Sequence, residues 1–195
     1  MSMIPELMGG RSLSHPLPLA VGKSSSKMYV GGQANADVAA GTTTATSDAE
    51  NECAEYSIPA NTLVAGSTIR VRWVTATSAS AGVETLITRL RFGSSTTASS
   101  NTEVAVSTAV DQTNGDFSCG DMIIQVRTSV TAVAFGTIAD SDGLGSKLVS
   151  AQFEPSFTID ATVANYINVT TLFSSTGANL ATTQGFIVDI VNPGV

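Results

Sequence analysis

The stretch Thr68-Ile-Arg-Val-Arg-Trp-Val-Thr75 decides the fold, because apolar and polar side chains alternate along it one by one. The stretch Glu84-Thr-Leu-Ile-Thr-Arg-Leu-Arg-Phe-Gly93 repeats this alternation a short distance downstream. A period of two is typical of a β-strand with one face in a core and the other face in solvent. We therefore predict two β-strands, which bury Ile69, Val71 and Trp73 from the first stretch and Leu86, Leu90 and Phe92 from the second.

The same pattern continues toward the end of the chain, with clusters of Gly, Asn, Asp and Ser between the apolar runs. This punctuation is typical of antiparallel β-sandwiches and barrels. The strands that we predict are 54–58, 68–76, 84–93, 103–109, 118–128, 130–138, 150–163 in one or two pieces, 165–174 and 184–191. Further core positions are Met122, Ile124, Val126, Phe157, Ile159, Ala161, Val163, Phe186, Val188 and Ile190. We predict an all-β fold, an antiparallel β-sandwich of jelly-roll type, with an immunoglobulin-like sandwich as the nearest competitor.

Length and composition predict one folded domain with an N-terminal arm. The chain has 195 residues, of which 43% are hydrophobic, enough for one sizeable core. Residues 1–52 have weak periodicity and several Pro and Gly, so we predict an extended arm there and the jelly-roll domain at 53–195. The arm either docks on another surface or subunit or folds back over its own body. The arm residues that we predict at an interface are Ile4, Leu7, Leu13, Leu17, Leu19 and Tyr29.

Charge and hydropathy disfavour several classes of partner. The net charge of -7 and the pI of about 4.5 argue against binding to nucleic acid, which needs clustered Lys and Arg. No apolar run is long enough to cross a bilayer, and the N-terminus lacks the apolar segment of a signal peptide, so we expect a soluble, unsecreted protein. Cys53 and Cys119 allow either one disulfide or two thiols, and we favour two thiols.

Residues for catalysis are sparse in this chain. His15 is the single histidine and lies between Ser14 and Pro16 in the arm, and the spacing of the acids fixes no two carboxylates together. Asp140-Ser-Asp-Gly143 could begin a calcium loop, but the acid that should close the loop is missing, so a turn is the favoured interpretation. We therefore predict no enzyme activity, no cofactor and no metal site.

Two pairs of arginines are the candidate interface residues of the body. Arg70 and Arg72 lie on the polar side of one predicted strand, and Arg89 and Arg91 lie on the polar side of the next. If these strands are neighbours, the four guanidinium groups share one outward face and need acids to balance them. The acids could come from this chain, for instance Glu55 and Glu84, or from a partner across an interface.

The sequence of residues 56–93 also resembles a known protein family. Tyr56-Ser-Ile-Pro-Ala-Asn-Thr-Leu-Val-Ala-Gly-Ser-Thr-Ile-Arg-Val-Arg72, followed by Leu86-Ile-Thr-Arg-Leu-Arg-Phe-Gly93, resembles the opening of small β-sandwich virion proteins of tailed bacteriophages. The resemblance is greatest to capsid decoration, or cement, proteins. It implies a jelly-roll homo-oligomer, a dimer or trimer, that binds the major capsid protein on the outer capsid surface and carries no catalytic residues.

Two functions remain open on this basis. The leading hypothesis is a cement protein whose arm and arginine face grip capsid subunits or sister copies. The alternative is a head- or tail-fibre module that binds a receptor or glycan through loops such as 94–102, 111–117 and 139–147. A polysaccharide depolymerase is disfavoured, because the sequence offers no carboxylate pair at a fixed spacing.

Overall fold

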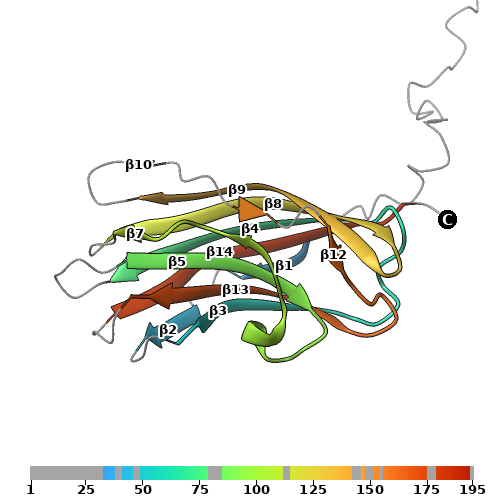
Figure 1. The fold of residues 1–195 in the computed structure, drawn as a ribbon, viewed down its shortest axis with the longest axis horizontal. Helices are drawn as coiled ribbons and strands as arrows, with labels where there is room; N and C mark the ends of the chain where they lie inside the picture. The colour runs from blue at the N-terminus through green and yellow to red at the C-terminus, as the bar shows by residue number, and fades with distance from the viewer. Residues whose placement is uncertain are drawn as a thin grey trace, which may run out of the picture.

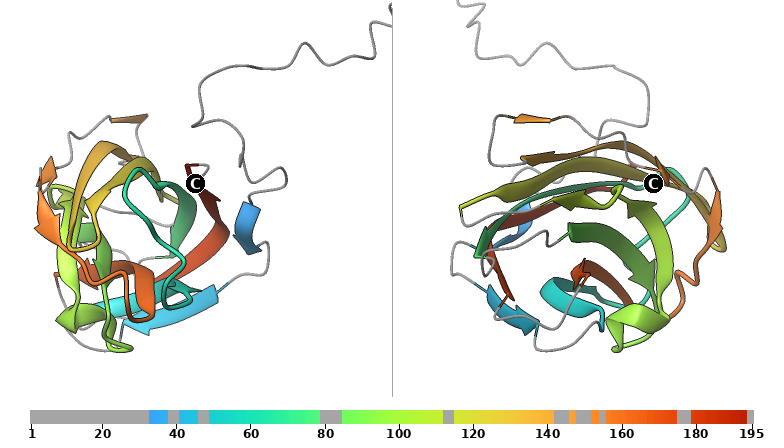
Figure 2. Two further views of the ribbon diagram at one scale, coloured as in Figure 1. Left: turned by 90° about the vertical axis from the view of Figure 1, so that its right-hand side faces the viewer. Right: turned by 60° about the vertical axis from the view of Figure 1, so that its left-hand side comes forward.

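Two antiparallel β-sheets face each other as the layers of a sandwich (Figures 1 and 2). The computed structural model describes residues 33–37, 41–45, 49–78, 85–111, 115–141, 146–147, 152–153, 156–174 and 179–193. Strands account for most of this part of the chain, and every strand pair is antiparallel. The predicted all-β fold, an antiparallel sandwich of jelly-roll type, is confirmed.

The larger sheet has eight strands among the described residues. They are β1 (Gln33–Asp37), β2 (Gly41–Ala45), β4 (Thr68–Ser78), β8 (Phe117–Thr128), β9 (Thr131–Ser141), β10 (Ser146–Lys147), β12 (Phe157–Thr158) and β14 (Asn179–Val191). Their order is β1-β14-β4-β8-β9-β10, with β2 also paired to β14 and β12 also paired to β9. The four long strands β14, β4, β8 and β9 thus form the middle of this sheet (Figure 1).

The smaller sheet has six strands within the same described ranges. They are β3 (Asn51–Ile58), β5 (Thr85–Gly93), β6 (Thr102–Val106), β7 (Val110–Asp111), β11 (Gln152–Phe153) and β13 (Asn165–Phe173). Their order is β11-β6-β5-β13-β3, with β7 also paired to β5. A short 3-10 helix, Ala98–Ser100, lies between β5 and β6.

Most consecutive strands lie in different sheets. The chain passes from β3 in the six-stranded sheet to β4 in the eight-stranded sheet and back to β5, and it crosses again between β13 and β14. The hairpins β5-β6 and β8-β9 are the places where successive long strands pair directly. This wrapping explains why β4 and β5, which are neighbours in sequence, are not neighbours in a sheet.

The core positions agree with the sequence pattern, with one exception. Fully or almost fully buried side chains include Ile69, Val71, Trp73, Leu86, Leu90, Phe92, Met122, Ile124, Val126, Phe157, Ile159, Ala161, Phe186, Val188 and Ile190. The prediction for Val163 is wrong, because its side chain is 39% exposed. The chain turns there, and Asp160 Oδ1 accepts a hydrogen bond from the backbone N of Thr162. The segment 150–163, predicted as one or two strands, supplies two short strands, β11 and β12.

Part of the predicted arm belongs to the sheet. β1 and β2 lie within residues 1–52, and both pair with β14 at the side opposite β4. These pairings correspond to the alternative in which the arm folds back over its own body. Residues 1–32 lie outside the described residues, so the boundary at residue 52 stays a prediction. Four of the observed strands, β1, β2, β7 and β10, have no counterpart among the strands predicted from the sequence.

The two cysteines are thiols that are not joined in a disulfide, and they lie on different sheets. Cys53 lies on β3 in the interior, in a small apolar cluster with Leu86, Phe173 and Ala181. Cys119 lies on the outer face of β8. The prediction of two thiols is confirmed, and the disulfide between sheets that is typical of antibody domains is absent from this pair.

Candidate functional site: the outer face of the eight-stranded sheet

The four arginines do not share one face. Arg70 and Arg72 are on β4 of the eight-stranded sheet, whereas Arg89 and Arg91 are on β5 of the six-stranded sheet. The two pairs therefore point away from each other on the two outer faces of the sandwich. The condition for a single arginine cluster, that the two strands are neighbours, is not met, because the chain crosses between the sheets from β4 to β5 and does not form a hairpin.

On the eight-stranded sheet, each arginine is paired with an acid of this chain. Arg70 Nε donates to Asp121 Oδ1 at 2.8 Å and its Nη2 donates to Asp121 Oδ2, a bidentate pair. Arg72 Nη2 donates to Asp189 Oδ2 at 2.9 Å. The hydrogen bond from Arg70 holds the pKa of Asp121 below its usual range. These acids are not Glu55 and Glu84, which the sequence suggested. Asp121 and Asp189 lie on β8 and β14, the strands on either side of β4.

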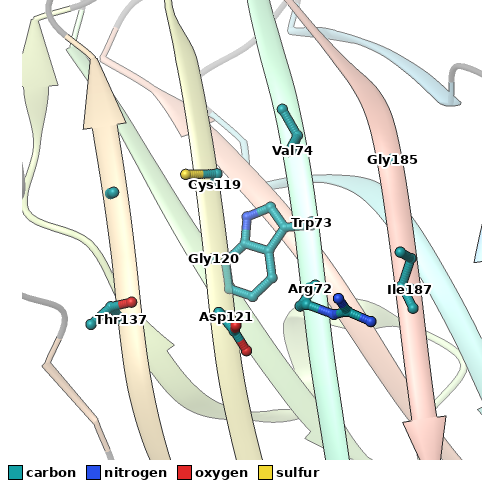
Figure 3. A pocket seen from close by; sticks show the side chains of 10 residues that line it. Arg72, Trp73, Val74, Cys119, Gly120, Asp121, Thr137, Gly185 and Ile187 are labelled. Carbon is teal, nitrogen blue, oxygen red and sulfur yellow. The ribbon is translucent and has the colours of Figure 1, made fainter. Parts of the chain in front are cut away.

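Between these ion pairs the outer face is hollowed into a trough with a volume of about 320 Å³ (Figure 3). It crosses the four middle strands of the sheet, β14, β4, β8 and β9. The residues that line it are Arg72, Trp73, Val74, Cys119, Gly120, Asp121, Thr137, Ala139, Gly185 and Ile187. We name this hollow the outer trough. The hollow forms because short side chains occupy one register row across the sheet. The residues of this row are Gly185, Val74, Cys119 and Ala139.

The floor of the outer trough depends on a glycine. Trp73 and Gly120 are register partners on β4 and β8, and the indole ring lies across β8 at Gly120 (Figure 3). A Cβ atom on Gly120 would stand 2.1 Å from Trp73 Cη2. Any larger residue at position 120 would therefore displace the buried ring.

Large apolar side chains surround the trough on the same face. Val74 is 42% exposed, Phe117 39% and Phe135 47%. Phe135 on β9 is the register partner of Ile123 on β8. On the outer face, this pair is next to the register pair of Asp121 and Thr137. The outer face of this sheet therefore combines exposed apolar area with charges that are balanced within the chain, a combination typical of binding surfaces.

The thiol of Cys119 faces the outer trough. Burial raises its pKa, and the negative charge of Asp140 raises it further. A thiol with a raised pKa is a weak nucleophile at neutral pH, since the thiolate is the reactive form. Cys119 is therefore better suited to packing and to chemical labelling than to catalysis.

The outer face of the six-stranded sheet has a different character. Arg91 donates through Nε to Glu50 Oε1 at 2.5 Å and through Nη2 to Glu50 Oε2 at 2.7 Å. Arg89 Nε donates to Glu103 Oε2 at 2.8 Å, and Thr170 donates to Glu50. The side chains of Glu50, Arg89 and Arg91 are only 14%, 15% and 13% exposed. We name this cluster the Glu50 network.

Glu50 is held in its charged form by the network. Burial alone would raise its pKa, but hydrogen bonds from Arg91 and Thr170 and the charges of Arg91 and Arg89 outweigh burial. The pKa of Glu50 therefore lies below its usual range. Glu50 sits just before β3, at a position that the sequence analysis assigned to the arm.

Beside the network, Glu52 and Glu55 are held together by one amide. Asn168 Nδ2 donates to Glu52 Oε2 at 2.9 Å and to Glu55 Oε2 at 3.1 Å. The spacing of the acids in the sequence did not indicate this pair. A register shift opposite Val169 and Thr170, typical of a β-bulge, brings both side chains to the same face. Burial and the neighbouring charge of Glu55 raise the pKa of Glu52.

Several predicted residues fall outside the described part of the chain. These are Ile4, Leu7, Leu13, Leu17, Leu19 and Tyr29 of the candidate interface, together with His15, Glu84 and residues 142–145. Asp140, by contrast, is described, and its side chain is buried at the inner face of β9. It is therefore not the solvated loop charge that the sequence suggested.

Two classes of feature are absent from the described residues. They contain no group of three or more His, Cys, Asp or Glu side chains arranged to hold a metal ion. Among the same residues, no helix has the length and apolar character needed to cross a membrane.

Comparison with known proteins gives similarity at the level of fold. No family model and no curated protein matches the chain. Among solved structures, the lectin UEA-II complexed with galactose is 12% identical, with a TM-score of 0.36, and the match covers 81% of this chain and 86% of the lectin.

Two further structures show similar distant likeness. One is infectious bursal disease virus strain Gt, at 12% identity and a TM-score of 0.33, where the match covers 82% of this chain and 32% of the viral chain. The other is the polysaccharide lyase family 18 protein aly-SJ02 r-CATD, at 7% identity and a TM-score of 0.33, covering 80% of this chain and 89% of that one.

Proposed function

We propose that the protein is a bacteriophage capsid decoration protein that binds the outer surface of the shell of major capsid protein and stabilises it without catalysis. The outer trough is the main observation that supports this proposal. It offers exposed apolar area on a rigid sheet, and its flanking arginines are already neutralised by Asp121 and Asp189. Burial of such a surface against another protein gains the apolar contribution without leaving an unpaired charge at the interface.

The arm supplies the second contact in this proposal. Residues 1–32 contain the apolar side chains that the sequence assigns to an interface, and β1 joins them to the edge of the eight-stranded sheet. A sheet face and a tether that act together raise the effective concentration of each contact once the other has formed. Many copies on a shell, as a homo-oligomer, would then add stability by mass action.

A binding assay with matched variants tests the proposal. Expanded shells that lack the protein are mixed with purified protein, and bound copies are counted after sedimentation. Wild-type protein is expected to bind in numbers that match the shell lattice. Val74→Glu puts a charge into the outer trough and is expected to lower occupancy at least tenfold, whereas Val130→Glu, at a 53% exposed turn position, is expected to bind normally.

The outcomes separate the function from the site. Absence of wild-type binding contradicts the decoration function itself. Full binding of Val74→Glu contradicts the assignment of the outer trough. Deletion of residues 2–30 is expected to leave a folded body that no longer attaches, and retained full occupancy would remove the arm from the proposal.

One observation favours the alternative, a fibre module that binds a receptor or glycan. Phe117 and Phe135 expose aromatic rings on the outer face of the eight-stranded sheet, and sugar-binding sites use aromatic surfaces with a few polar groups beside them. Copy number per virion separates the two functions, since hundreds of copies indicate a shell protein and a few dozen or fewer indicate a fibre. Binding on a glycan array that is lost in Phe135→Ala would support the alternative.

A further inference from the structure

A polar layer crosses the interior of the sandwich and divides its apolar core. Four buried residues lie in one register row across the eight-stranded sheet, on β14, β4, β8 and β9: Thr183, Thr75, Ser118 and Asp140. On the six-stranded sheet, Thr88 and Thr171 are register partners and are also buried. The large apolar cluster around Trp73 lies on one side of this layer, and the small cluster around Leu86 and Phe173 lies on the other.

One half of the polar layer is satisfied by hydrogen bonds within the protein. Thr183 Oγ1 donates to the backbone O of Cys53 at 2.8 Å, across the space between the sheets. Cys53 Sγ and Thr171 Oγ1 are 3.2 Å apart and share a hydrogen bond. In this half, the hydrogen bond from Thr183 to Cys53 links the two sheets, and the side chains of Thr183, Cys53 and Thr171 all have hydrogen-bond partners.

The other half has oxygens without protein partners. Thr75 Oγ1 and Thr88 Oγ1 are buried and make no hydrogen bond to the protein. The carboxylate of Asp140 is also buried, and it is approached by the neutral hydroxyls of Ser118 and Ser107. Asp140 is only 2% exposed, and the arginines Arg70, Arg72, Arg89 and Arg91 form their ion pairs with other acids. Buried polar groups are nearly always hydrogen-bonded, and an isolated buried charge is far more costly than an isolated hydroxyl. A buried carboxylate that is met by neutral hydroxyls, with two unpartnered hydroxyl oxygens in the same half of the layer, therefore indicates a ligand.

We propose that Asp140, Ser118, Thr75 and Thr88 form an internal site for a monovalent hard cation, Na⁺. Carboxylate and hydroxyl oxygens are the donors that hard cations prefer. One positive charge balances the one carboxylate, whereas Ca²⁺ would leave an excess charge buried and usually takes several acidic ligands. The site is internal and separate from the outer trough.

Two other groups can compete for the same carboxylate. The first is a proton, because burial raises the pKa of Asp140, although the nearby Ser118 and Ser107 hydroxyls partly oppose that rise. The second is Lys147 of β10, which lies opposite Asp140 in register. Cys119 of β8 is the other titratable group close enough to feel the charge of Asp140. A test must therefore separate Na⁺ from a proton and from the lysine.

Thermal unfolding of the full chain in two matched salts distinguishes Na⁺ from a proton and from Lys147. At pH 8, NaCl is compared with choline chloride at equal ionic strength, so that general screening is the same in both. Wild-type Tm is expected to be higher in NaCl by about 2 to 4 °C, as for a ligand present at several times its Kd in a chain of this size. The difference is expected to disappear at pH values low enough to protonate Asp140, because a proton and Na⁺ compete for it.

Variants assign the effect to the site. Asp140→Asn is expected to abolish the difference between the two salts, and the matched change Asp160→Asn, at an exposed acid, is expected to keep it. Ser118→Ala removes one neutral ligand with less risk to folding and is expected to weaken apparent Na⁺ affinity at least tenfold. Lys147→Met is expected to leave the Na⁺ effect intact. A ²³Na NMR line broadened by wild-type protein but not by Asp140→Asn would show binding directly.

Three results would overturn the proposal. Equal wild-type Tm values in both salts would show that Na⁺ does not bind. A gain of stability in Asp140→Asn of equal size in both salts would identify a proton as the occupant. Loss of the pH dependence in Lys147→Met, without any Na⁺ effect in the wild type, would identify the lysine as the counter-ion.

Discussion

The arginines on the two outer faces of the sandwich have different surroundings. On the six-stranded sheet, Arg89 and Arg91 pair with Glu103 and Glu50 in a network in which both arginines and Glu50 have little exposed area. On the eight-stranded sheet, Arg70 and Arg72 form single pairs with side chains 48% and 40% exposed, beside an apolar hollow. The first face has its polar groups largely satisfied within the chain, whereas the second leaves apolar area in solvent. Under the proposed function, the first face contributes mainly to stability and the second face binds the partner.

The largest effect that we expect comes from the floor of the outer trough. Gly120→Ala places a Cβ atom inside the Trp73 ring, so we expect a loss of about 3 kcal/mol of unfolding free energy, the upper range for overpacking. Urea denaturation measures it. Gly185→Ala is the matched control in the same trough, because its Cβ atom would meet nothing within 4 Å, and a change below about 0.5 kcal/mol is expected. Equal losses in the two variants would contradict the packing of Trp73 on β8.

The next effect distinguishes the two faces directly. Glu50→Gln leaves Arg91 half-buried without its charge partner, and we expect it to cost about 1 to 3 kcal/mol at pH 7. Because the folded pKa of Glu50 is lowered, its contribution is present above the unfolded pKa and is lost as pH falls through the folded pKa. Chemical denaturation of variant and wild type from pH 7 to acid should show their difference shrinking. A difference that stays constant would mean that Glu50 acts through packing alone.

The matching change on the other face should have a smaller effect. Asp121→Asn removes the charge partner of Arg70, but both side chains are more than two-fifths exposed, so we expect a loss of about 0 to 1 kcal/mol. The loss should shrink further when salt is added, since exposed pairs are screened. A cost as large as that of Glu50→Gln would remove the distinction between the faces.

The smallest effect has the opposite sign. The pKa of Glu52 is raised in the folded state, which therefore binds more protons than the unfolded state, so stability falls as pH rises from the unfolded pKa through the folded pKa. Glu52→Gln is expected to stabilise the protein by about 0.5 kcal/mol at pH 7, because it removes the repulsion from Glu55 in a partly exposed site. Destabilisation would show that the hydrogen bond from Asn168 outweighs that repulsion.

The sequence predicted the long strands well and the arrangement of the arginines poorly. Alternation of apolar and polar residues is a local signal, so Ile69, Val71, Trp73, Leu90 and Phe92 could be assigned to the core from their own strands. Which strand pairs with which depends on contacts between distant segments. The separation of Arg70 and Arg72 from Arg89 and Arg91 follows from such a choice and has no local signal.

The surface that we propose for binding could not be predicted from the sequence for the same reason. The outer trough needs Gly185, Val74, Cys119 and Ala139 in one row, and these residues come from four strands whose register is set by the whole sheet. Asp140 was interpreted as part of a turn because acids and glycine follow one another there, yet β9 extends to Ser141 and carries the carboxylate into the interior. Turn composition alone could not indicate where the strand would end.

Protection of Cys119 tests the central claim, that the outer face of the eight-stranded sheet is the surface covered in the assembled state. Cys119 lines the outer trough, and Cys53 is a buried internal control in the same chain. The rate of maleimide labelling at Cys119 is measured for free and for shell-bound protein by mass spectrometry. We expect labelling to slow at least tenfold on the shell while Cys53 stays unlabelled in both states, and an unchanged rate at Cys119 in fully bound protein would contradict the claim.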